Sequence, residues 1–397
     1  MAILVDDEIL LDYGIKPSDP PQYPIGGLRP GSVVISHGHL DHCGIAANLM
    51  DIKPDMFMTQ VTRDMAVLLA RDTMKIAESK GYVLPFIYED IRDFELLSNT
   101  VNYGMDFELS GYNGRLYDAG HIPGSASVFL ENENNSLIFT GDINDQDTHL
   151  IKAMQTLPTA DITIIESTYF GSDHNPRDKL EDGLIASIEE TVDSGGWAVI
   201  PAFAIGRTQE VLMILAKHGI QAWVDGMGVD VGNILRSNPA YLKDPGLFNK
   251  AFRYANIVNS RERHKVMDEP CAIVTTAGML NGGPVLYYLS KMYNDPLSRI
   301  LLTGYQVEGT NGRKIIEKGY YEDRGRVMHL KAKSELYDLS AHCGDKGLKK
   351  IVQQQVDGGC ENVICVHGDN TDGFASWINE NLEVNAISPV NTDHIHI

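Results

Sequence analysis

Residues 36–42 read Ser-His-Gly-His-Leu-Asp-His and guide the interpretation of the rest of the chain. Three imidazoles and a carboxylate fall within six residues, directly after the apolar stretch 31–35. Nitrogen and oxygen donors of this kind suit a borderline metal such as zinc. Extended spacing puts His37 and His39 on one side of the turn, while Asp41 and His42 can face a second ion. A single histidine is usually an ordinary core or surface residue, but this combination indicates a metal site.

Further ligands must come from other turns, because one cluster cannot complete two coordination shells. His121 in AGHIPGSAS, Asp142 in FTGD and His367 in VHGD each follow or close a strand-like segment. A glycine beside each of them lets the backbone bend around an ion. Each residue alone would be interpreted as an ordinary turn residue, so only their combination indicates a metal site.

Short apolar strands alternate with amphipathic helices along the chain, which is typical of an α/β protein. The strand-like segments are 31–36, 136–142, 161–168, 197–203, 271–277, 298–304 and 361–369. Helical spacing covers 179–193 and 207–218, and residues 42–50 open another helix. Polar residues cluster just after several strands, where layered α/β folds usually place their sites.

The length and composition predict two globular domains. The chain has 397 residues, 43% of them hydrophobic and 22% charged, which excludes a disordered protein. No apolar run reaches the roughly 18–20 residues that a membrane helix needs, and no secretion signal opens the chain. The five cysteines are scattered without a CxxC pair, so we expect a reducing, cytoplasmic environment and no membrane partner.

The charge of the chain is strongly acidic but unevenly distributed. The 33 basic and 54 acidic residues give a net charge of −21, which repels phosphate backbones at long range. Residues 171–345 hold 20 basic and 22 acidic residues, and the remainder holds 13 and 32. The nearly neutral part could carry a basic groove, so the net charge does not exclude nucleic acid.

The ordered motifs resemble a known superfamily. HxHxDH followed by His121 and Asp142 resembles the metallo-β-lactamase superfamily. ESTYF (166–170), DLSAHCG (338–344) and VICVHGD (363–369) resemble motifs A, B and C of its β-CASP nuclease branch. PAFAIGRTQE (201–210), TAGMLNGGP (276–284) and GYQVEGTNGR (304–313) resemble the inserted domain of the cleavage-and-polyadenylation type of nuclease and its archaeal relatives. The resemblance spans nearly the whole chain.

This resemblance implies a fold and a ligand set. Residues 1–171 and 338–397 would form a four-layer αβ/βα metallo-β-lactamase domain, interrupted by an α/β β-CASP domain at 172–337. One metal would be bound by His37, His39 and His121, and the other by Asp41, His42 and His367. Asp142 would bridge the two ions, expected to be Zn²⁺ with Mn²⁺ as a substitute.

Three further residues receive supporting roles from the resemblance. Asp12 in LLDYG would support a ligand histidine, although a plain turn residue is the alternative. Glu166 and His342 match the carboxylate–histidine pair of the branch. His342 would act as general acid, oriented by Glu166, whereas the alternative is a buried structural pair.

The implied activity is two-metal hydrolysis of a phosphodiester bond that leaves a 5′-phosphate and a 3′-hydroxyl. A histidine in motif C goes with RNA-processing members of the branch, so His367 favours RNA over DNA. We expect the RNA to be single-stranded. The lack of an appended RNA-binding module favours a 5′→3′ exoribonuclease resembling archaeal RNase J. The alternatives are an endoribonuclease of the mRNA 3′-end processing or termination type, a non-catalytic dimerising scaffold, and a small-molecule hydrolase such as a thioesterase or lactonase. Segment 172–337 and motif B would have no use in the last of these.

RNA contacts are expected from the inserted domain and motif B. Arg207 and Arg313 lie in glycine-containing loops where a guanidinium could bind phosphate, although a surface salt bridge is the alternative. Ser340 could help to bind a terminal phosphate. The basic run 261–265 reads as a solvated face.

Both chain ends carry expectations about the sheets. LLDYG lies so near the start that we expect one bare sheet edge. The tail ISPVNTDHIHI (387–397) alternates apolar residues and could form an edge strand in a homodimer or a simple terminal strand. Membership of an RNA-processing complex is a further option.

Overall fold

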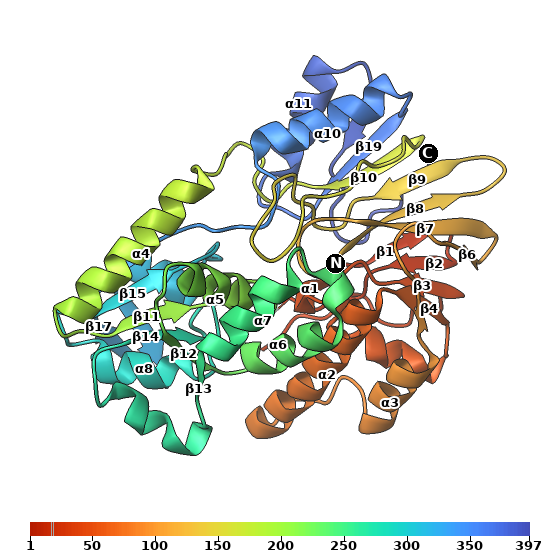
Figure 1. Ribbon diagram of the computed structural model, residues 1–397. Helices are drawn as coiled ribbons and strands as arrows, with labels where there is room; N and C mark the ends of the chain where they lie inside the picture. Colours follow the sequence, from red (N-terminus) through yellow and green to blue (C-terminus); the bar gives the residue numbers. More distant parts are fainter. Residues whose placement is uncertain (17, 19) are drawn as a thin grey trace. The chain divides into compact units, whose positions relative to one another are not determined.

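The computed structural model describes residues 1–16, 18 and 20–397, which divide into two units (Figure 1). The first unit comprises Met1–Asp147, Lys152–Asp173 and Ala341–Ile397. The second comprises Thr148–Ile151 and His174–Ser340. A four-residue piece of the N-terminal half therefore belongs to the second unit, although residues on both sides of it belong to the first.

One sheet of the first unit has five strands in the order β1-β2-β3-β4-β5. They are Ile3–Val5, Ile9–Leu11, Ser32–Val34, Asp55–Met58 and Asn99–Thr100. The expectation of a bare edge next to LLDYG is wrong, because β1 pairs with β2. The two strands are antiparallel, and Ile3 lies opposite Leu11. Asp6 and Asp7 adopt left-handed conformations (φ 49° and 57°) that reverse the chain between the two strands.

The other sheet of this unit has seven strands in the order β20-β19-β10-β9-β8-β7-β6. In chain order, strands β6, β7, β8, β9, β10, β19 and β20 are Asp106–Leu109, Tyr112–Asp118, Ala126–Glu131, Ser136–Phe139, Ile162–Glu166, Asn362–Val366 and Asn385–Ile387. Strands β10 and β19 are parallel, with Glu166 opposite Val366. Segments about 200 residues apart therefore end side by side, and the residues that follow both strands meet at one sheet edge.

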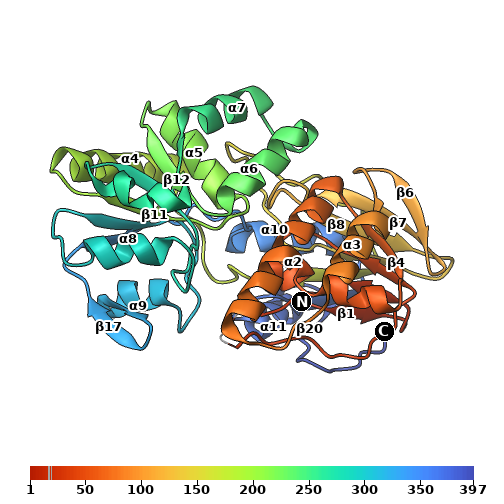
Figure 2. The same ribbon diagram turned by 90° about the horizontal axis from the view of Figure 1, so that it is seen from below.

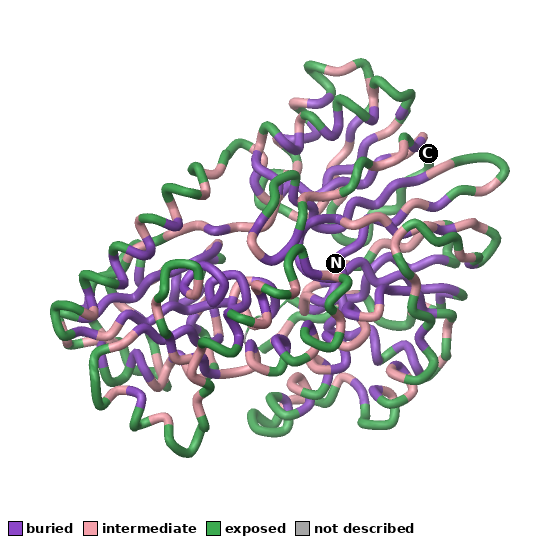
Figure 3. The backbone as a smooth tube through the Cα atoms, viewed as in Figure 1, coloured by how far each residue is buried: buried purple, intermediate pink, exposed green. Residues whose placement is uncertain are grey.

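Helices cover the outer faces of both sheets, which gives the predicted four-layer α/β architecture (Figure 1), and Figure 2 shows the helices over the first sheet from their outer side. Ile9 and Leu11 of β2 point into the core between the sheets, whereas Leu10 packs under the helical layer. This alternation follows from the two-residue period of a strand. Helices α2 (Gln60–Lys80) and α3 (Tyr88–Leu97) cover the first sheet, and α10 (Asp345–Asp357) and α11 (Thr371–Asn381) cover the second. Figure 3 shows the sheet strands as largely buried.

The helix expected to open at 42–50 is interrupted. Helix α1 (Leu40–Cys43) is a single turn, and a 3₁₀ turn, η1 (Ala46–Asp51), follows it. The Ile45 amide donates to the carbonyl oxygen of Tyr13 instead of continuing the helical ladder. This bond ties the metal-motif turn to the segment after β2.

The second unit contains a six-stranded parallel sheet in the order β13-β12-β14-β11-β15-β18. In chain order its strands β11, β12, β13, β14, β15 and β18 are Ala198–Pro201, Ala222–Asp225, Asn256–Ile257, Ala272–Thr275, Arg299–Leu302 and Lys333–Leu336. The helices α4 to α9 are Arg177–Asp193, Arg207–Lys217, Gly228–Ser237, Pro245–Tyr254, Val285–Met292 and Asn311–Lys318. Two 3₁₀ turns, η2 (Pro239–Tyr241) and η3 (Ser260–Met267), and a hairpin of β16 (Tyr320–Asp323) and β17 (Arg326–His329) complete the unit. The helices predicted at 179–193 and 207–218 correspond to α4 and α5.

In the single chain, the C-terminal tail does not form the simple terminal strand that was one of the two expectations. Strand β20 ends at Ile387, and residues 388–397 are not assigned to a strand. Within the described residues, no helix combines the length and apolar character that crossing a membrane requires.

Candidate metal centre

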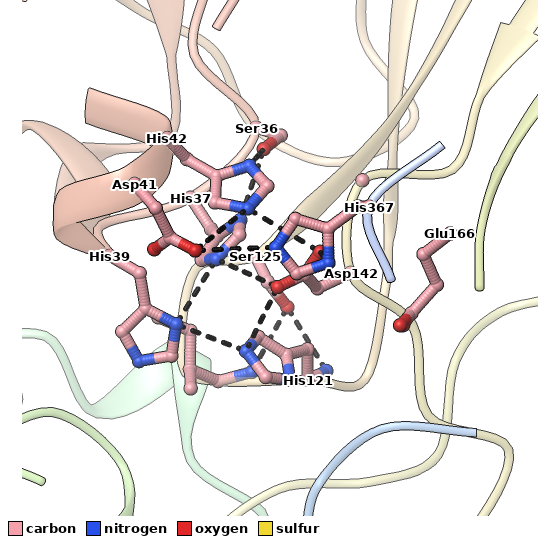
Figure 4. A network of polar contacts seen from close by, with 12 residues as sticks. Ser36, His37, His39, Asp41, His42, His121, Ser125, Asp142, Glu166 and His367 are labelled. Carbon is pink, nitrogen blue, oxygen red and sulfur yellow. Dashed lines mark hydrogen bonds and ion pairs between the residues drawn. The ribbon is translucent and has the colours of Figure 1, made fainter. Parts of the chain in front are cut away.

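The seven predicted ligands come together in the first unit, in the segments that follow several of its strands (Figure 4). His37, His39, Asp41 and His42 follow β3. His121 follows β7, Asp142 follows β9 and His367 follows β19. The two sheets thus bring together residues more than 300 positions apart in the sequence.

The first group of donor atoms comes from His37, His39, His121 and Asp142. His39 Nδ1 lies 3.2 Å from His37 Nε2 and 3.1 Å from His121 Nε2. Asp142 Oδ2 lies 3.5 Å from His37 Nε2 and 3.7 Å from His121 Nε2. Three imidazole nitrogens and one carboxylate oxygen therefore surround a common point.

The second group comes from Asp41, His42 and His367, with the other oxygen of Asp142 beside it. Asp41 Oδ2 lies 3.2 Å from His367 Nε2 and 3.9 Å from His42 Nε2. Asp142 Oδ1 lies 3.4 Å from His42 Nε2. The Asp142 carboxylate thus presents one oxygen to each group, as a bridging ligand would.

These distances fit divalent metal ions. A tetrahedral site with metal–nitrogen bonds of 2.0–2.1 Å places its ligand atoms about 3.3 Å apart, close to the observed separations. His42 Nε2 and Asp142 Oδ1 are buried, and neither has a hydrogen-bond partner among the described residues. Buried polar atoms without partners are uncommon in folded proteins, and metal coordination would satisfy both.

Asp12 and Ser36 contact the ring nitrogens of His42 and His37 that face away from the two donor groups. Asp12 is fully buried, and its carboxylate accepts hydrogen bonds from Ser36 N at 2.7 Å and Ser36 Oγ at 2.8 Å. The same carboxylate lies 2.7 Å from His42 Nδ1, so this nitrogen carries the proton and Nε2 is left for coordination. Ser36 Oγ also lies 3.0 Å from His37 Nδ1.

Two other contacts that orient ligands were not predicted from the sequence. His121 Nδ1 lies 2.7 Å from the carbonyl oxygen of Ala341, and Thr168 Oγ1 lies 3.1 Å from His367 Nδ1. Ser36 and Thr168 stand inside the quoted motifs SHGHLDH and ESTYF, directly after strands, and this position is the only sequence signal for them. The Ala341 contact uses a backbone carbonyl and has no such signal.

Burial and close charges strongly shift the pKa values in this cluster. Burial and the neighbouring imidazoles hold the pKa values of His37 and His121 well below 6.5, and burial lowers the pKa of His39 to about 4. Burial alone would lower the pKa of His367, but the Asp142 and Asp41 carboxylates raise it to about 10. The first group therefore consists of neutral imidazoles, the form that binds metal.

Glu166 and His342 form a pair beside the ligands. Glu166 is 1% exposed, and its Oε2 lies 2.9 Å from His342 Nδ1. Burial alone would lower the pKa of His342, but the Glu166 carboxylate raises it. Glu166 Oε1 also accepts a hydrogen bond from the backbone of Ile143, the residue after Asp142, at 2.7 Å. The pair is therefore linked to the turn that carries Asp142.

The predicted RNA-contact residues lie in the second unit. Arg207 begins α5 and is half-buried, and Ser340 is the last residue of the unit. Arg313 lies 2.5 Å from the carboxylate of Glu317, one helical turn later in α9. In the basic run 261–265, Arg263 binds Asp225 through two nitrogens, so that side chain is part of an ion pair.

Known proteins with related sequences match the whole chain. Residues 208–315 match the Beta-Casp domain family, and residues 327–389 match the family described as a Zn-dependent metallo-hydrolase RNA specificity domain. RNase aCSPSF2 of Saccharolobus solfataricus is 33% identical over 99% of this chain and 81% of that protein. In Methanocaldococcus jannaschii, the transcription termination factor FttA is 30% identical over 99% of this chain and 68% of that protein. An RNase J-like protein of the same organism is 33% identical over 96% and 92%.

The fold, the motifs and these relatives agree. The four-layer unit contains the HxHxDH turn, and the parallel-sheet unit contains the Beta-Casp match. The described residues offer donor groups suited to metal, consistent with a metal-dependent hydrolase. The chain belongs to the metallo-β-lactamase β-CASP ribonuclease family.

Proposed function

We propose that this protein is a two-metal 5′→3′ exoribonuclease that hydrolyses single-stranded RNA. The observation that carries the proposal is the convergence of seven donor residues in two adjacent groups, with one oxygen of the Asp142 carboxylate toward each group. A scaffold protein would not need an intact set of seven ligands, nor the outer contacts that hold their rings.

Two zinc ions, with manganese as a substitute, would be held by the two groups described above. His37, His39 and His121 would hold one ion, Asp41, His42 and His367 the other, and Asp142 both. Bound ions of this kind supply a hydroxide at neutral pH and neutralise charge on a phosphoryl oxygen.

The His342–Glu166 pair would supply the proton for the leaving group. Because Glu166 engages Nδ1, proton transfer to a 3′-oxygen would run through His342 Nε2. The P–O3′ bond would break as an oxygen of water bonds to phosphorus, and the products would carry a 5′-phosphate and a 3′-hydroxyl that takes its proton from His342.

The second unit would bind the RNA strand. Arg207 and Arg313 would contact backbone phosphates, and Ser340 a terminal phosphate. Arg313 would exchange the exposed partner Glu317 for a phosphate, a small change in energy because exposed ion pairs contribute little stability.

The exonuclease mode is supported by the similarity to an RNase J-like protein over 92% of its length. The similarity to a transcription termination factor supports the alternative, cleavage within the strand. Assembly as a homodimer is part of the proposal, because β20 lies at a sheet edge where another strand could pair. Sedimentation velocity would show two copies, and a monomer at every concentration would contradict the dimer.

Two RNAs of one sequence test the cleavage mode. The linear RNA carries a 5′-monophosphate and an internal label, the circular RNA has no end, and His342→Ala serves as the inactive control. Mononucleotides from the linear RNA with the circle intact are expected. A cut circle would establish an endonuclease, and no cleavage of either RNA by metal-loaded protein would contradict the ribonuclease proposal.

A further inference from the structure

The loop after Asp142 forms a strap that enters the second unit and returns. We define the strap as residues 143–155 and its tip as Thr148–Ile151. The tip belongs to the second unit, whereas the arms on either side belong to the first. Asp147 Oδ1 accepts a hydrogen bond from Ala153 N at 2.8 Å, which closes the strap at the base of the tip.

The arms hold the turns that carry two of the candidate ligands. Asn144 N donates to the carbonyl oxygen of Ala119 at 3.0 Å, and Gln155 N donates to that of Asp118 at 2.8 Å. These acceptors precede His121 by two and three residues, and Asn144 follows Asp142 by two. Gly120 lies so close that an added Cβ would come within 2.3 Å of Met154 N. Movement of the arms would therefore displace the turns of both His121 and Asp142.

Glu210 fastens the tip. Its carboxylate is buried and accepts hydrogen bonds from His149 N at 3.0 Å and Leu150 N at 2.8 Å, one on each oxygen. Lys243 adds a bond from its backbone N to the Leu150 carbonyl oxygen at 2.9 Å. Leu150 is buried, so the tip is an integral part of the second unit's packing.

A cation site at this place is a weaker interpretation. His149, Glu181 and Glu210 offer atoms close enough to bind a metal ion. Arg177 already lies 2.5 Å from Glu210, and Lys217 lies 3.4 Å from Glu181. These cations supply the positive charge, so the cluster serves to hold the tip.

We infer that Glu210, the last residue of the GRTQE segment, is a positioning residue for the metal centre. Through the strap, it restrains the turns of Asp142 and His121 from within the second unit. The inference rests on the proposed function only in treating these two turns as metal-ligand turns. In this inference, the Glu210 carboxylate sets the geometry of the metal centre and does not contact RNA.

The test compares Glu210→Gln with Glu181→Gln. Both variants lose one carboxylate of the same cluster, but only Glu210→Gln disturbs the bonds to the tip backbone. Amide hydrogen exchange of metal-free protein is expected to quicken at Asn144 and Gln155 in Glu210→Gln alone. Zinc affinity is measured by competition with a chromophoric chelator and is expected to fall about tenfold. This is the lower end of the roughly 10- to 100-fold loss found when a group that hydrogen-bonds to a metal ligand is removed, because Glu210 acts through the strap.

A second variant covers the case in which Glu210→Gln does not fold. Two glycines inserted after Asp147 and two after Ile151 lengthen both arms and leave the Glu210 contacts in place. This variant should show the same faster exchange and weaker zinc binding. If folded variants keep the parent's arm exchange and zinc affinity, the inference is overturned. If the parent binds zinc without cleaving RNA while Glu210→Gln behaves as expected, the proposed function fails and the inference stands.

Discussion

Replacing Asp12 with asparagine would test how much the metal centre depends on the groups behind its ligands. Asp12 has a left-handed backbone conformation (φ 59°), which asparagine tolerates nearly as well as aspartate. The substitution keeps the size of the side chain and the backbone shape. Any effect therefore reports the loss of one charged acceptor.

The contacts of Asp12 set the expected magnitude. Oδ1 accepts from Ser36 N at 2.7 Å, and Oδ2 faces both Ser36 Oγ and His42 Nδ1. An amide placed with its NH₂ toward Ser36 N sets two donors against each other. The opposite orientation sets NH₂ against His42 Nδ1 and forces the proton onto Nε2, the coordinating nitrogen. Either outcome should weaken metal binding by 10- to 100-fold, about 1.4–2.7 kcal/mol.

The assay is zinc competition against a chromophoric chelator, with parent and Asp12→Asn loaded identically. Urea unfolding of both metal-free proteins is the control for stability. Ser36→Ala gives a graded comparison, because it removes the hydroxyl contacts but leaves the bond from the Ser36 backbone. Unchanged zinc affinity in Asp12→Asn would refute the reasoning that Asp12 sets the tautomer of His42.

Substitutions at His342, Gly14 and Glu181 test other parts of the molecule. His342→Ala should lower the cleavage rate about 10²- to 10⁴-fold with unchanged zinc content, and single-turnover cleavage plus metal analysis checks both; loss of zinc would contradict the assignment of His342 to proton transfer and not to metal binding. Gly14→Ala would place a Cβ 1.8 Å from the Asp41 carbonyl oxygen, so urea unfolding should show about 3 kcal/mol less stability, and a stability equal to the parent's would disprove the contact. Burial alone would raise the pKa of Glu181, but His149, Lys217 and Arg177 lower it below 4.5. This ion pairing therefore stabilises the protein above about pH 4.5, and the stabilisation is lost as pH falls through the lowered pKa. The thermal unfolding temperatures of the parent and Glu181→Gln should converge as pH is lowered below about 4.5; a constant difference would count against this pairing.

The chemistry of the metal motif could be predicted from the sequence because its ligands are adjacent. The turn 36–42 contains four donor residues in one stretch, and the strand-then-glycine pattern indicated His121, Asp142 and His367. The structure brings all seven together. Their assignment as ligands is a proposal that metal analysis tests.

Other features depended on contacts between distant parts of the chain. Pairing of β10 with β19 depends on packing across about 200 residues, and no local pattern reveals it. The break after α1 follows from a bond between Ile45 and Tyr13, which helical propensity does not contain. Strand β1 has only three residues, too few for a visible alternation. The tip Thr148–Ile151 lies within a long loop and carries no sequence signal for the second unit.

Metal stoichiometry measured together with RNA cleavage shows whether the two donor groups form a catalytic centre with two metal ions. Metal-free protein is titrated with zinc, and native mass spectrometry counts bound ions while cleavage of 5′-monophosphorylated RNA is followed in the same samples. Asp142→Ala, which removes the shared carboxylate, is the matched variant. We predict two ions per chain, cleavage that appears as the second ion binds, and loss of both in the variant. Cleavage by metal-free protein, or two bound ions without cleavage, would contradict a two-metal ribonuclease.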